Sequence, residues 1–427
     1  MILKKISILL LLFCCNKSDA VAQDNLYARY TTNENRDKIH KRLVNNTILF
    51  NLSLPLTDTT EEKWEEAFGA MEFLLYKNPM VDKKIEEAFE NLQSRSKSFQ
   101  RALLELAYTS YPSRYLTQTD DLLRGTNDPK IFAMSAEYIL QSSQDSLTVE
   151  TIEELMISKF SHQSTDPILV RLSEQLSEIK FSSPSFIDNK FFTDILNRNF
   201  LPGNTIMYSF QRKDRDFPGL VVIRNKDGIF VRDSAEIFNV PQLARSINNL
   251  PSYLTNGNTP QGIFRMKGFD VSMSMFIGPS PNVQLTMPGE TSLINFFADS
   301  SIYDTIWNKE FYAKLLPITL QNYSPLYHSY YAGLAGRSEI IAHGTAINPE
   351  YFKGKPYYPH TPSLGCLSTK EIWNGRRLES NQKKLINGLL KAGGADGYCV
   401  VIELDDKKAA VTIEELLPHL LKAALVK

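Results

Sequence analysis

A histidine and a cysteine in the last third of the chain carry the side chains that covalent catalysis needs. His343 ends an apolar run at 340–342, and Cys366 follows Gly365. A cysteine attacks through its thiolate, and a nearby imidazole can take the thiol proton. A glycine before the cysteine lets the backbone turn tightly, so the N–H groups of Gly365 and Cys366 can point at a developing oxyanion. These residue types indicate a cysteine nucleophile with an imidazole base; a core cysteine and a satisfied polar histidine are the structural alternatives.

The sequence around these residues resembles the catalytic motif of the L,D-transpeptidases, the bacterial peptidoglycan cross-linking enzymes with a YkuD-type domain. The family signature is a histidine, commonly in His-Gly-Thr, then a variable lid and Ser-x-Gly-Cys with an apolar residue after it. The two parts here are His343-Gly344-Thr345 and Ser363-Leu364-Gly365-Cys366-Leu367. Upstream, the segment 259–264 (TPQGIF) is similar to the family's Thr-Pro-x-Gly-x-Phe. The resemblance covers about residues 203–405.

The resemblance implies a role for each residue of the motif. Cys366 would be the nucleophile and His343 the base that activates it. The backbone carbonyl of Gly344 would orient the imidazole. The residues that would shape the loop beneath the cysteine are Ser363, Leu364 and Gly365.

Two positions depart from the family pattern. Many members have a histidine where this chain has Leu364, and an Asn or Arg where it has Ser368. The separation of 23 residues between His343 and Cys366 is also long for the family, which predicts an enlarged lid over residues 346–361. His360 lies in this lid and is a candidate replacement for the missing imidazole, with an exposed lid residue as the alternative.

Side chains near the motif are expected to bind a stem peptide, because aromatic faces can hold its apolar part and cations can meet its carboxylates. Alternation along a strand would turn only some of several neighbouring tyrosines toward the site, and a solvated arginine pair is the alternative for Arg376. The candidate substrate-binding residues are Tyr327, Tyr330, Tyr331, Thr345, His360 and Arg376.

The resemblance implies a peptidoglycan L,D-transpeptidase. The thiolate would attack a tetrapeptide stem between an L-centre and the terminal D-residue, and the amine of a second stem would resolve the thioester into a 3→3 cross-link. Water as the acceptor would make the same site an L,D-carboxypeptidase. Papain-like and NlpC/P60 peptidases are disfavoured because they place the cysteine before the histidine along the chain. A non-catalytic peptidoglycan-binding envelope protein is the remaining alternative.

No metal or organic cofactor is expected at this site. Zinc sites usually show pairs of ligands at short spacing, and His343, His360 and Cys366 lack that spacing. The apolar neighbours of Cys399 predict a buried, inert thiol rather than a disulfide partner for Cys366.

The elements that must position these residues change character near residue 200. From about residue 59 to 199, apolar residues recur every three or four positions. Asp128-Pro129 and Asp166-Pro167 each combine an N-cap acid with a proline suited to the first helical turn. These two steps are 38 residues apart, which is compatible with helical repeats. After residue 200 we expect strands at 219–223 and 398–402, and helices at 242–250, 382–391 and 413–425.

An α+β fold follows from this division. Residues 23–199 are expected to form an all-helical domain, a scaffold or a docking surface for an unknown protein partner. Residues 200–427 are expected to form a mainly antiparallel, L,D-transpeptidase-like catalytic domain. Separate cores would let a fragment that starts near Phe200 fold and keep its site, unless the helices pack across the substrate groove.

Residues 1–22 have the order of a secretory signal peptide: a short basic start, an apolar run at 6–13 and the small-residue triplet 20–22. Residues 12–15 also resemble a bacterial lipobox, which implies a lipid anchor at Cys14 or Cys15. We therefore expect export to the periplasm or to the envelope of a bacterium, and the sequence leaves open whether the mature protein is lipidated or soluble.

Composition narrows the remaining classes. A chain of 427 residues exceeds one ordinary domain, and its four cysteines are too few for a disulfide scaffold. The 47 basic and 48 acidic residues nearly cancel, so no bulk field draws the protein to nucleic acid. Recognition of a substrate or partner must therefore depend on local surface features rather than on the net charge.

Overall fold

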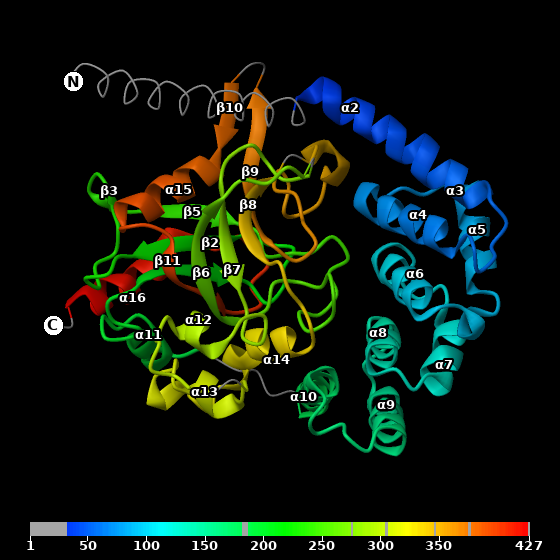
Figure 1. The fold of residues 1–427 in the computed structure, drawn as a ribbon, viewed down its shortest axis with the longest axis horizontal. Coiled ribbons are helices and arrows are strands. Elements are labelled where there is room, and N and C mark those ends of the chain that lie inside the picture. Colours follow the sequence, from blue (N-terminus) through cyan, green and yellow to red (C-terminus); the bar gives the residue numbers. More distant parts are fainter. Residues whose placement is uncertain are drawn as a thin grey trace, which may run out of the picture.

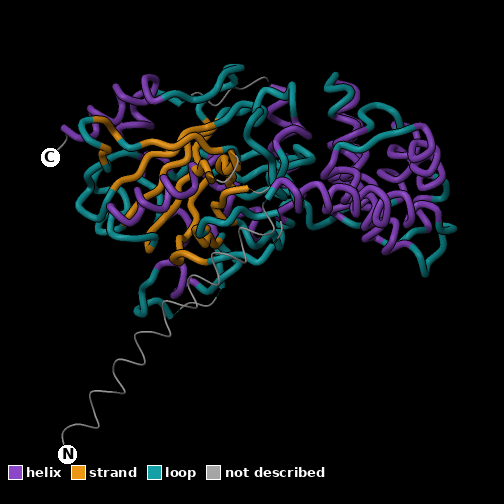
Figure 2. Tube along the Cα trace, turned by 90° about the horizontal axis from the view of Figure 1, so that it is seen from above, coloured by secondary structure: helices purple, strands orange, loops and turns teal. Residues whose placement is uncertain are grey.

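The described chain begins with an all-helical part on one side of the molecule, and the strands lie on the other side together with further helices (Figures 1 and 2). The structure is a computed structural model that describes residues 32–181, 187–274, 276–303, 306–345, 347–374 and 377–425. The residues described before 196 are helical or in turns, and the strands begin at Thr205. The α+β class predicted from the sequence is confirmed.

The helices before residue 182 stack in two rows that curve around one side of the sheet (Figure 1). An inner row of α4, α6, α8 and α10 faces the sheet, and α5, α7 and α9 form the outer row. The helices are α2 (Asn33–Arg42), η1 (Leu43–Leu49), α3 (Phe50–Ser53), α4 (Glu61–Leu74), α5 (Pro79–Phe89), η2 (Leu92–Ser94), α6 (Lys97–Ser110), α7 (Leu116–Gly125), α8 (Pro129–Leu140), α9 (Ser146–Lys159) and α10 (Pro167–Phe181).

The predicted N-caps of two inner helices are confirmed. The Asp128 carboxylate accepts the N–H groups of Lys130 and Ile131 at the start of α8. The Asp166 carboxylate accepts those of Ile168 and Leu169 at the start of α10. Each cap satisfies N–H groups that have no partner within the helix, so each fixes where its helix begins.

The rest of the described chain forms a nine-stranded sheet, a small hairpin and covering helices. The sheet order is β10-β9-β8-β7-β6-β11-β1-β2-β5, in which only the pairs β8–β9 and β1–β11 are parallel. The strands are β1 (Thr205–Gln211), β2 (Gly219–Arg224), β3 (Arg232–Asp233), β4 (Glu236–Ile237), β5 (Asn239–Gln242), β6 (Gly262–Asp270), β7 (Asn282–Thr286), β8 (Ile341–Thr345), β9 (Leu367–Asn374), β10 (Arg377–Ser380) and β11 (Asp396–Glu403). The further helices are α11 (Asn189–Ile195), α12 (Leu293–Phe297), α13 (Lys309–Ala313), η3 (Ile318–Leu320), η4 (Ser324–Tyr327), α14 (His328–Leu334), η5 (Pro349–Phe352), α15 (Asn381–Lys391) and α16 (Ile413–Leu425).

Most elements predicted after residue 200 are present. The predicted strands 219–223 and 398–402 lie in β2 and β11, and the predicted helices 382–391 and 413–425 are α15 and α16. The predicted helix 242–250 is wrong. That segment is irregular because the backbone N–H and C=O of Leu243 pair with Ser368 of β9, at 2.8 Å each, instead of with a helical neighbour.

This Leu243–Ser368 pairing joins the two ends of the sheet. β5 precedes Leu243 at one end of the strand order, and Ser368 lies in β9 near the other end. The sheet therefore curls, with one apolar core enclosed against α15 and another between its other face and α11 to α14 and α16. The segment after Leu243 continues beside residue 363, where the Ile247 N–H donates to the Ser363 carbonyl at 2.8 Å.

The helical array and the sheet share buried surface. Leu250, Tyr253 and Leu254 follow β5 in the sequence, but they are buried in the core of the helical array. Conversely, α11 precedes residue 200 but packs in the core against the sheet. The two cores interlock on both sides of the boundary near residue 200. No helix among the described residues is both long and apolar enough to cross a membrane.

The interlocking cores predict that a fragment from Phe200 to the C-terminus is markedly less stable than the full chain. It loses α11 and exposes Leu250, Tyr253 and Leu254, and each buried apolar side chain of this size stabilises by about 1.5–3 kcal/mol. A fragment from Ile187 keeps α11 and should melt at an intermediate temperature. Equal melting temperatures for the full chain and the shorter fragment, measured by circular dichroism, would show that the shared surface contributes nothing.

Candidate active site

His343 and Cys366 lie on neighbouring strands that run in the same direction. His343 is in β8 and pairs with Ser368 of β9, and Cys366 immediately precedes β9. His343 and Ser368 lie side by side on one face of the sheet, and Cys366 stands in a bend two residues before Ser368. The parallel pairing therefore brings the two candidate catalytic residues to the same end of neighbouring strands.

The imidazole of His343 is held in one orientation by its neighbour. Its Nδ1 lies 2.7 Å from the Gly344 carbonyl oxygen and donates to it, which leaves Nε2 as the nitrogen that can accept a proton. The same carbonyl also accepts the N–H of Gly278 at 2.6 Å, which fixes its direction. The hydrogen bond expected from the family resemblance is present. Burial lowers the pKa of His343, so the ring is neutral at neutral pH and ready to act as a base.

Gly344 has to be a glycine because a carboxyl group fills the space beside it. A Cβ at this position would lie 1.9 Å from Oε2 of Glu371. The other oxygen of Glu371 accepts the hydroxyls of Ser280 and Ser380, which lock the side chain in place. Glu371 thus supports the backbone that orients His343, and burial raises the pKa of its carboxyl.

The loop before Cys366 is a tight turn with several fixed points. The Ser363 hydroxyl donates to the Cys366 carbonyl at 2.9 Å, and the Thr259 hydroxyl donates to the Gly365 carbonyl at 2.8 Å. Gly365 has φ +105°, a conformation that favours glycine. A Cβ there would lie 2.4 Å from both the Gly257 carbonyl and Nη2 of Arg337. The two glycines of the motif are therefore needed for close packing.

The Cys366 thiol is protonated in this arrangement. Cys366 keeps partial solvent exposure, and its Sγ lies 3.6 Å from the Glu339 carbonyl, to which the thiol donates. Burial raises the pKa of the Cys366 thiol. A hydrogen bond from the Ile341 N–H and the charge of Arg337 partly oppose this rise, and the charge of Glu339 adds to it. Neutral thiol beside neutral imidazole is the resting state, so deprotonation must accompany attack.

The lid covers this face and contacts the helical array. Phe352 and Tyr357 are buried with Leu243, and the Thr361 hydroxyl donates to the Thr345 hydroxyl at 2.7 Å. Thr345 therefore ties the lid to β8, and its hydroxyl is engaged in this contact rather than free for a substrate.

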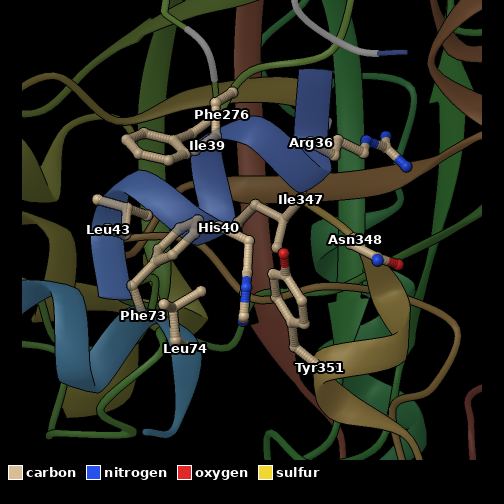
Figure 3. Close-up of a pocket in the computed structure, with 10 residues that line it drawn as sticks. All are labelled: Arg36, Ile39, His40, Leu43, Phe73, Leu74, Phe276, Ile347, Asn348 and Tyr351. Carbon is tan, nitrogen blue, oxygen red and sulfur yellow. The ribbon is translucent and has the colours of Figure 1, made fainter. Parts of the chain in front are cut away.

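A narrow crevice of about 20 Å³ lies between the lid and α2 (Figure 3). Ile347, Asn348 and Tyr351 of the lid form one side of it, and the ring of Tyr351 lies 5.2 Å from that of His40 on α2. The residues that line this crevice include neither Cys366 nor His343. It is a seam between the lid and the helical array.

His360 is buried rather than exposed, against the alternative considered for it. It is 9% exposed, and neither ring nitrogen has a hydrogen-bond partner. Burial lowers its pKa to about 4, so the ring is neutral at neutral pH. Its backbone N–H donates to the Tyr357 carbonyl within the lid. The structure gives it no hydrogen bond to the cysteine loop.

The remaining candidates divide between the core, the surface and the residues outside the described ranges. Tyr327 and Tyr330 are buried against Tyr312 in the core between the sheet and α14, which differs from the substrate-facing position expected for them. Tyr331 is half-buried at the edge of the same core. Leu364 is 59% exposed beside Cys366. Arg376 lies outside the described residues, and Cys399 is a buried, free thiol as predicted.

Sequence reasoning missed three features of the site. Arg337 lies in a turn before β8, and nothing in its neighbours in the sequence indicates burial beside the cysteine loop. Glu371 follows the motif by five residues and looks like an ordinary strand carboxylate. The loop 248–258, which contacts both Arg337 and the helices, gave no chemical signal. Comparison of the chain with protein-family models, curated proteins and solved structures finds no match.

Replacement of Gly344 tests the orientation of the base. Gly344→Ala should lower the activity of the site by ~10²–10⁴-fold, the usual loss for a general base, because the new methyl group displaces either Glu371 or the carbonyl that holds His343. The variant should remain folded by circular dichroism. Ala342→Gly, which changes the other neighbour of His343 on the same face of β8 as Gly344, is the control and should cost far less activity.

The neutral thiol at rest predicts that Cys366 loses its proton at a higher pH in the folded protein than in the unfolded chain. The midpoint of its alkylation by iodoacetamide should lie at higher pH in the folded protein than in urea, because burial disfavours the thiolate. Peptide mapping by mass spectrometry separates Cys366 from Cys399. A midpoint below that of the unfolded chain, roughly 8.5, would instead indicate a thiolate–imidazolium pair at rest.

Proposed function

We propose that the protein is a cysteine-dependent peptidoglycan L,D-transpeptidase of the bacterial envelope. The observation that carries the proposal is the orientation of His343 by the Gly344 carbonyl, on a strand that pairs with the one that starts directly after Cys366 and its glycine turn. A nucleophile, a neutral base and an orienting group are the parts that acyl transfer requires. The motifs that resemble the family supply these parts, in a fold whose mainly antiparallel sheet agrees with the one expected.

The reaction would begin when a tetrapeptide stem enters under the lid. Nε2 of His343 takes the thiol proton as Sγ of Cys366 attacks the carbonyl carbon between the L-centre and the terminal D-residue. The N–H groups of Gly365 and Cys366 are the candidate donors to the oxyanion. When the tetrahedral intermediate collapses, the C–N bond breaks, and the imidazolium returns its proton to the departing amine of the D-residue. A thioester remains.

A second stem would complete the cycle. Its side-chain amine attacks the thioester carbonyl and loses a proton to His343, and the Cys366 sulfur leaves and is protonated again. Water in place of the amine gives L,D-carboxypeptidase activity with the same groups, so acceptor access decides between the two outcomes. A non-catalytic peptidoglycan-binding protein is the alternative. In that case the neutral, buried thiol would not react with stems.

The export signal, the lipid anchor at Cys14 or Cys15 and the docking role of the helical array complete the proposal. The first two concern residues outside the described ranges. A carbapenem tests the proposal directly, because its strained amide resembles the donor bond: the thiolate attacks the lactam carbonyl, the ring C–N bond breaks, and an adduct of the intact mass remains on Cys366. Unmodified Cys366 after incubation with a carbapenem, in a folded protein, argues for the non-catalytic alternative.

Single substitutions separate the roles of the candidate residues. Cys366→Ala should abolish turnover of purified tetrapeptide muropeptides, and His343→Ala should reduce it by ~10²–10⁴-fold, the usual contribution of a general base. His360→Ala should cost much less, because His360 has no bond to the cysteine loop. Mass spectrometry of the products measures all three. If His360→Ala proves the more damaging histidine variant, the base has been misassigned.

A further inference from the structure

Arg337 is a buried cation that has no carboxylate partner among the described residues. It is 5% exposed. Its guanidinium donates to three backbone carbonyls of one loop: Nη1 to Ser252 and Asn258, and Nη2 to Gly257 at 2.8 Å. Burial lowers the pKa of Arg337 to about 10, so the side chain is still charged at neutral pH. Burying a charge that is hydrogen-bonded only to carbonyl oxygens costs free energy unless a favourable interaction with another group offsets that cost.

The group beside this cation is the cysteine loop. Nη2 of Arg337 would lie 2.4 Å from a Cβ at Gly365, so the guanidinium packs directly against the residue before Cys366. The charge of Arg337 favours the Cys366 thiolate, and the thiolate in turn favours the guanidinium. Glu339 acts on Cys366 in the opposite direction, and His343 is neutral at rest. Among the described residues, Arg337 is therefore the positive charge that acts on the sulfur.

We propose that Arg337 is a positioning residue for Cys366, fixing the Gly365 turn and supplying the positive charge that the attacking sulfur requires. Its effect is preorganised electrostatic stabilisation, because the charge is already oriented before the thiolate forms. The inference rests on the proposed function only in that Cys366 is the nucleophile.

The same contacts connect the helical array to the cysteine. The loop 248–258 that accepts the hydrogen bonds of Arg337 lies against the inner row of helices. The Tyr253 hydroxyl donates to Glu137 on α8, and the Asn256 side chain donates to Oε2 of Glu105 on α6 at 3.0 Å. Nζ of Lys130 on α8 donates to the Thr255 hydroxyl at 2.9 Å. The array thus holds the loop, the loop holds Arg337, and Arg337 holds the turn before Cys366.

Burial shapes these anchoring contacts. It raises the pKa of Glu137 to about 7 and also raises that of Glu105. Tyr253 and Asn256 donate to these carboxyls, which lowers their pKa and partly offsets the rise. The contacts between the helical array and the loop 248–258 are thus made by the neutral side chains of Tyr253 and Asn256, and through them the array acts on the Cys366 thiol from a distance.

The test measures the reactivity of the Cys366 thiol in the full chain. Iodoacetamide alkylation is followed from pH 7 to 9, where Arg337 keeps its charge, with peptide mapping to isolate Cys366. Arg337→Met should slow alkylation about tenfold at a given pH, equivalent to one pKa unit, and Arg337→Lys should restore part of the rate. The matched control is Arg224→Met. Arg224 is also buried and donates to the Asn197 and Phe200 carbonyls, but it packs near α11.

The control separates positioning from general stability. Both methionine variants should lose stability, whereas only Arg337→Met should change the alkylation rate of Cys366. An alkylation profile that matches the wild type in a folded Arg337→Met protein overturns the proposal. Iodoacetamide alkylation does not depend on peptidoglycan. If the wild-type protein leaves muropeptides unchanged, but Arg337→Met still slows the alkylation of Cys366, the result counts against the proposed function and not against the role of Arg337.

A second variant covers the case in which Arg337→Met does not fold. Tyr253→Phe combined with Asn256→Ala removes two anchors of the loop and leaves Arg337 and Cys366 intact. This double variant should slow Cys366 alkylation in the same direction by a smaller factor, roughly threefold, because only part of the effect of the two lost hydrogen bonds reaches the loop. An unchanged rate would overturn the link from the helical array, and would overturn the proposal altogether if Arg337→Met cannot be measured.

Discussion

The pairing of Leu243 with Ser368 is the constraint on which the arrangement of the site depends. It brings the last strand at one end of the sheet against β9 at the other. Once the ends are joined, the chain after Leu243 has to run beside the loop that contains Cys366, since Ile247 and Thr259 both bond to it or to its neighbours. The backbone around the thiol is therefore set by contacts between segments more than 100 residues apart in the sequence.

The burial that shapes this site also keeps it unreactive in its resting state. Desolvation disfavours the charged forms of both Cys366 and His343, so before a substrate arrives the site holds a neutral thiol beside a neutral imidazole base. The lid adds to this effect, because its aromatic residues and its hydroxyl contact to Thr345 keep the face closed. The charge that remains in place is on Arg337, whose guanidinium is surrounded by carbonyls rather than carboxylates. A site of this kind keeps its cysteine protonated, so the thiolate is not available to electrophiles in solution.

The sequence was informative where the signal was local. N-caps at Asp128 and Asp166, the two C-terminal helices and two buried strands depend on neighbouring residues, and the structure has all of them. The helix expected at 242–250 failed because a partner 125 residues away competes for the backbone of Leu243.

Side chains show the same division between local and distant causes. Glycine in the motif predicted a tight turn before Cys366, and φ at Gly365 agrees. Tyr327 and Tyr330 stand close to β8 in the sequence, yet they face the opposite core, because a helix rather than a strand carries them there. Arg337 could not be found at all, since its importance comes from Gly365 and three carbonyls that only folding brings together.

The spacing of carboxyl groups along the inner helices limits how this protein can change in length. Glu72 on α4, Glu105 on α6 and Glu137 on α8 follow one another at 33 and 32 residues. Glu72 and Glu137 are buried and Glu105 is half-buried where the inner row meets the loop 248–258. An array of stacked helices usually tolerates the gain or loss of one repeating pair, because each pair contacts only its neighbours. Here the gain or loss of one helix pair would move some of these glutamates away from the loop residues that they contact. The number of helix pairs and the length of that loop are therefore coupled, and related chains that differ in one should differ in the other.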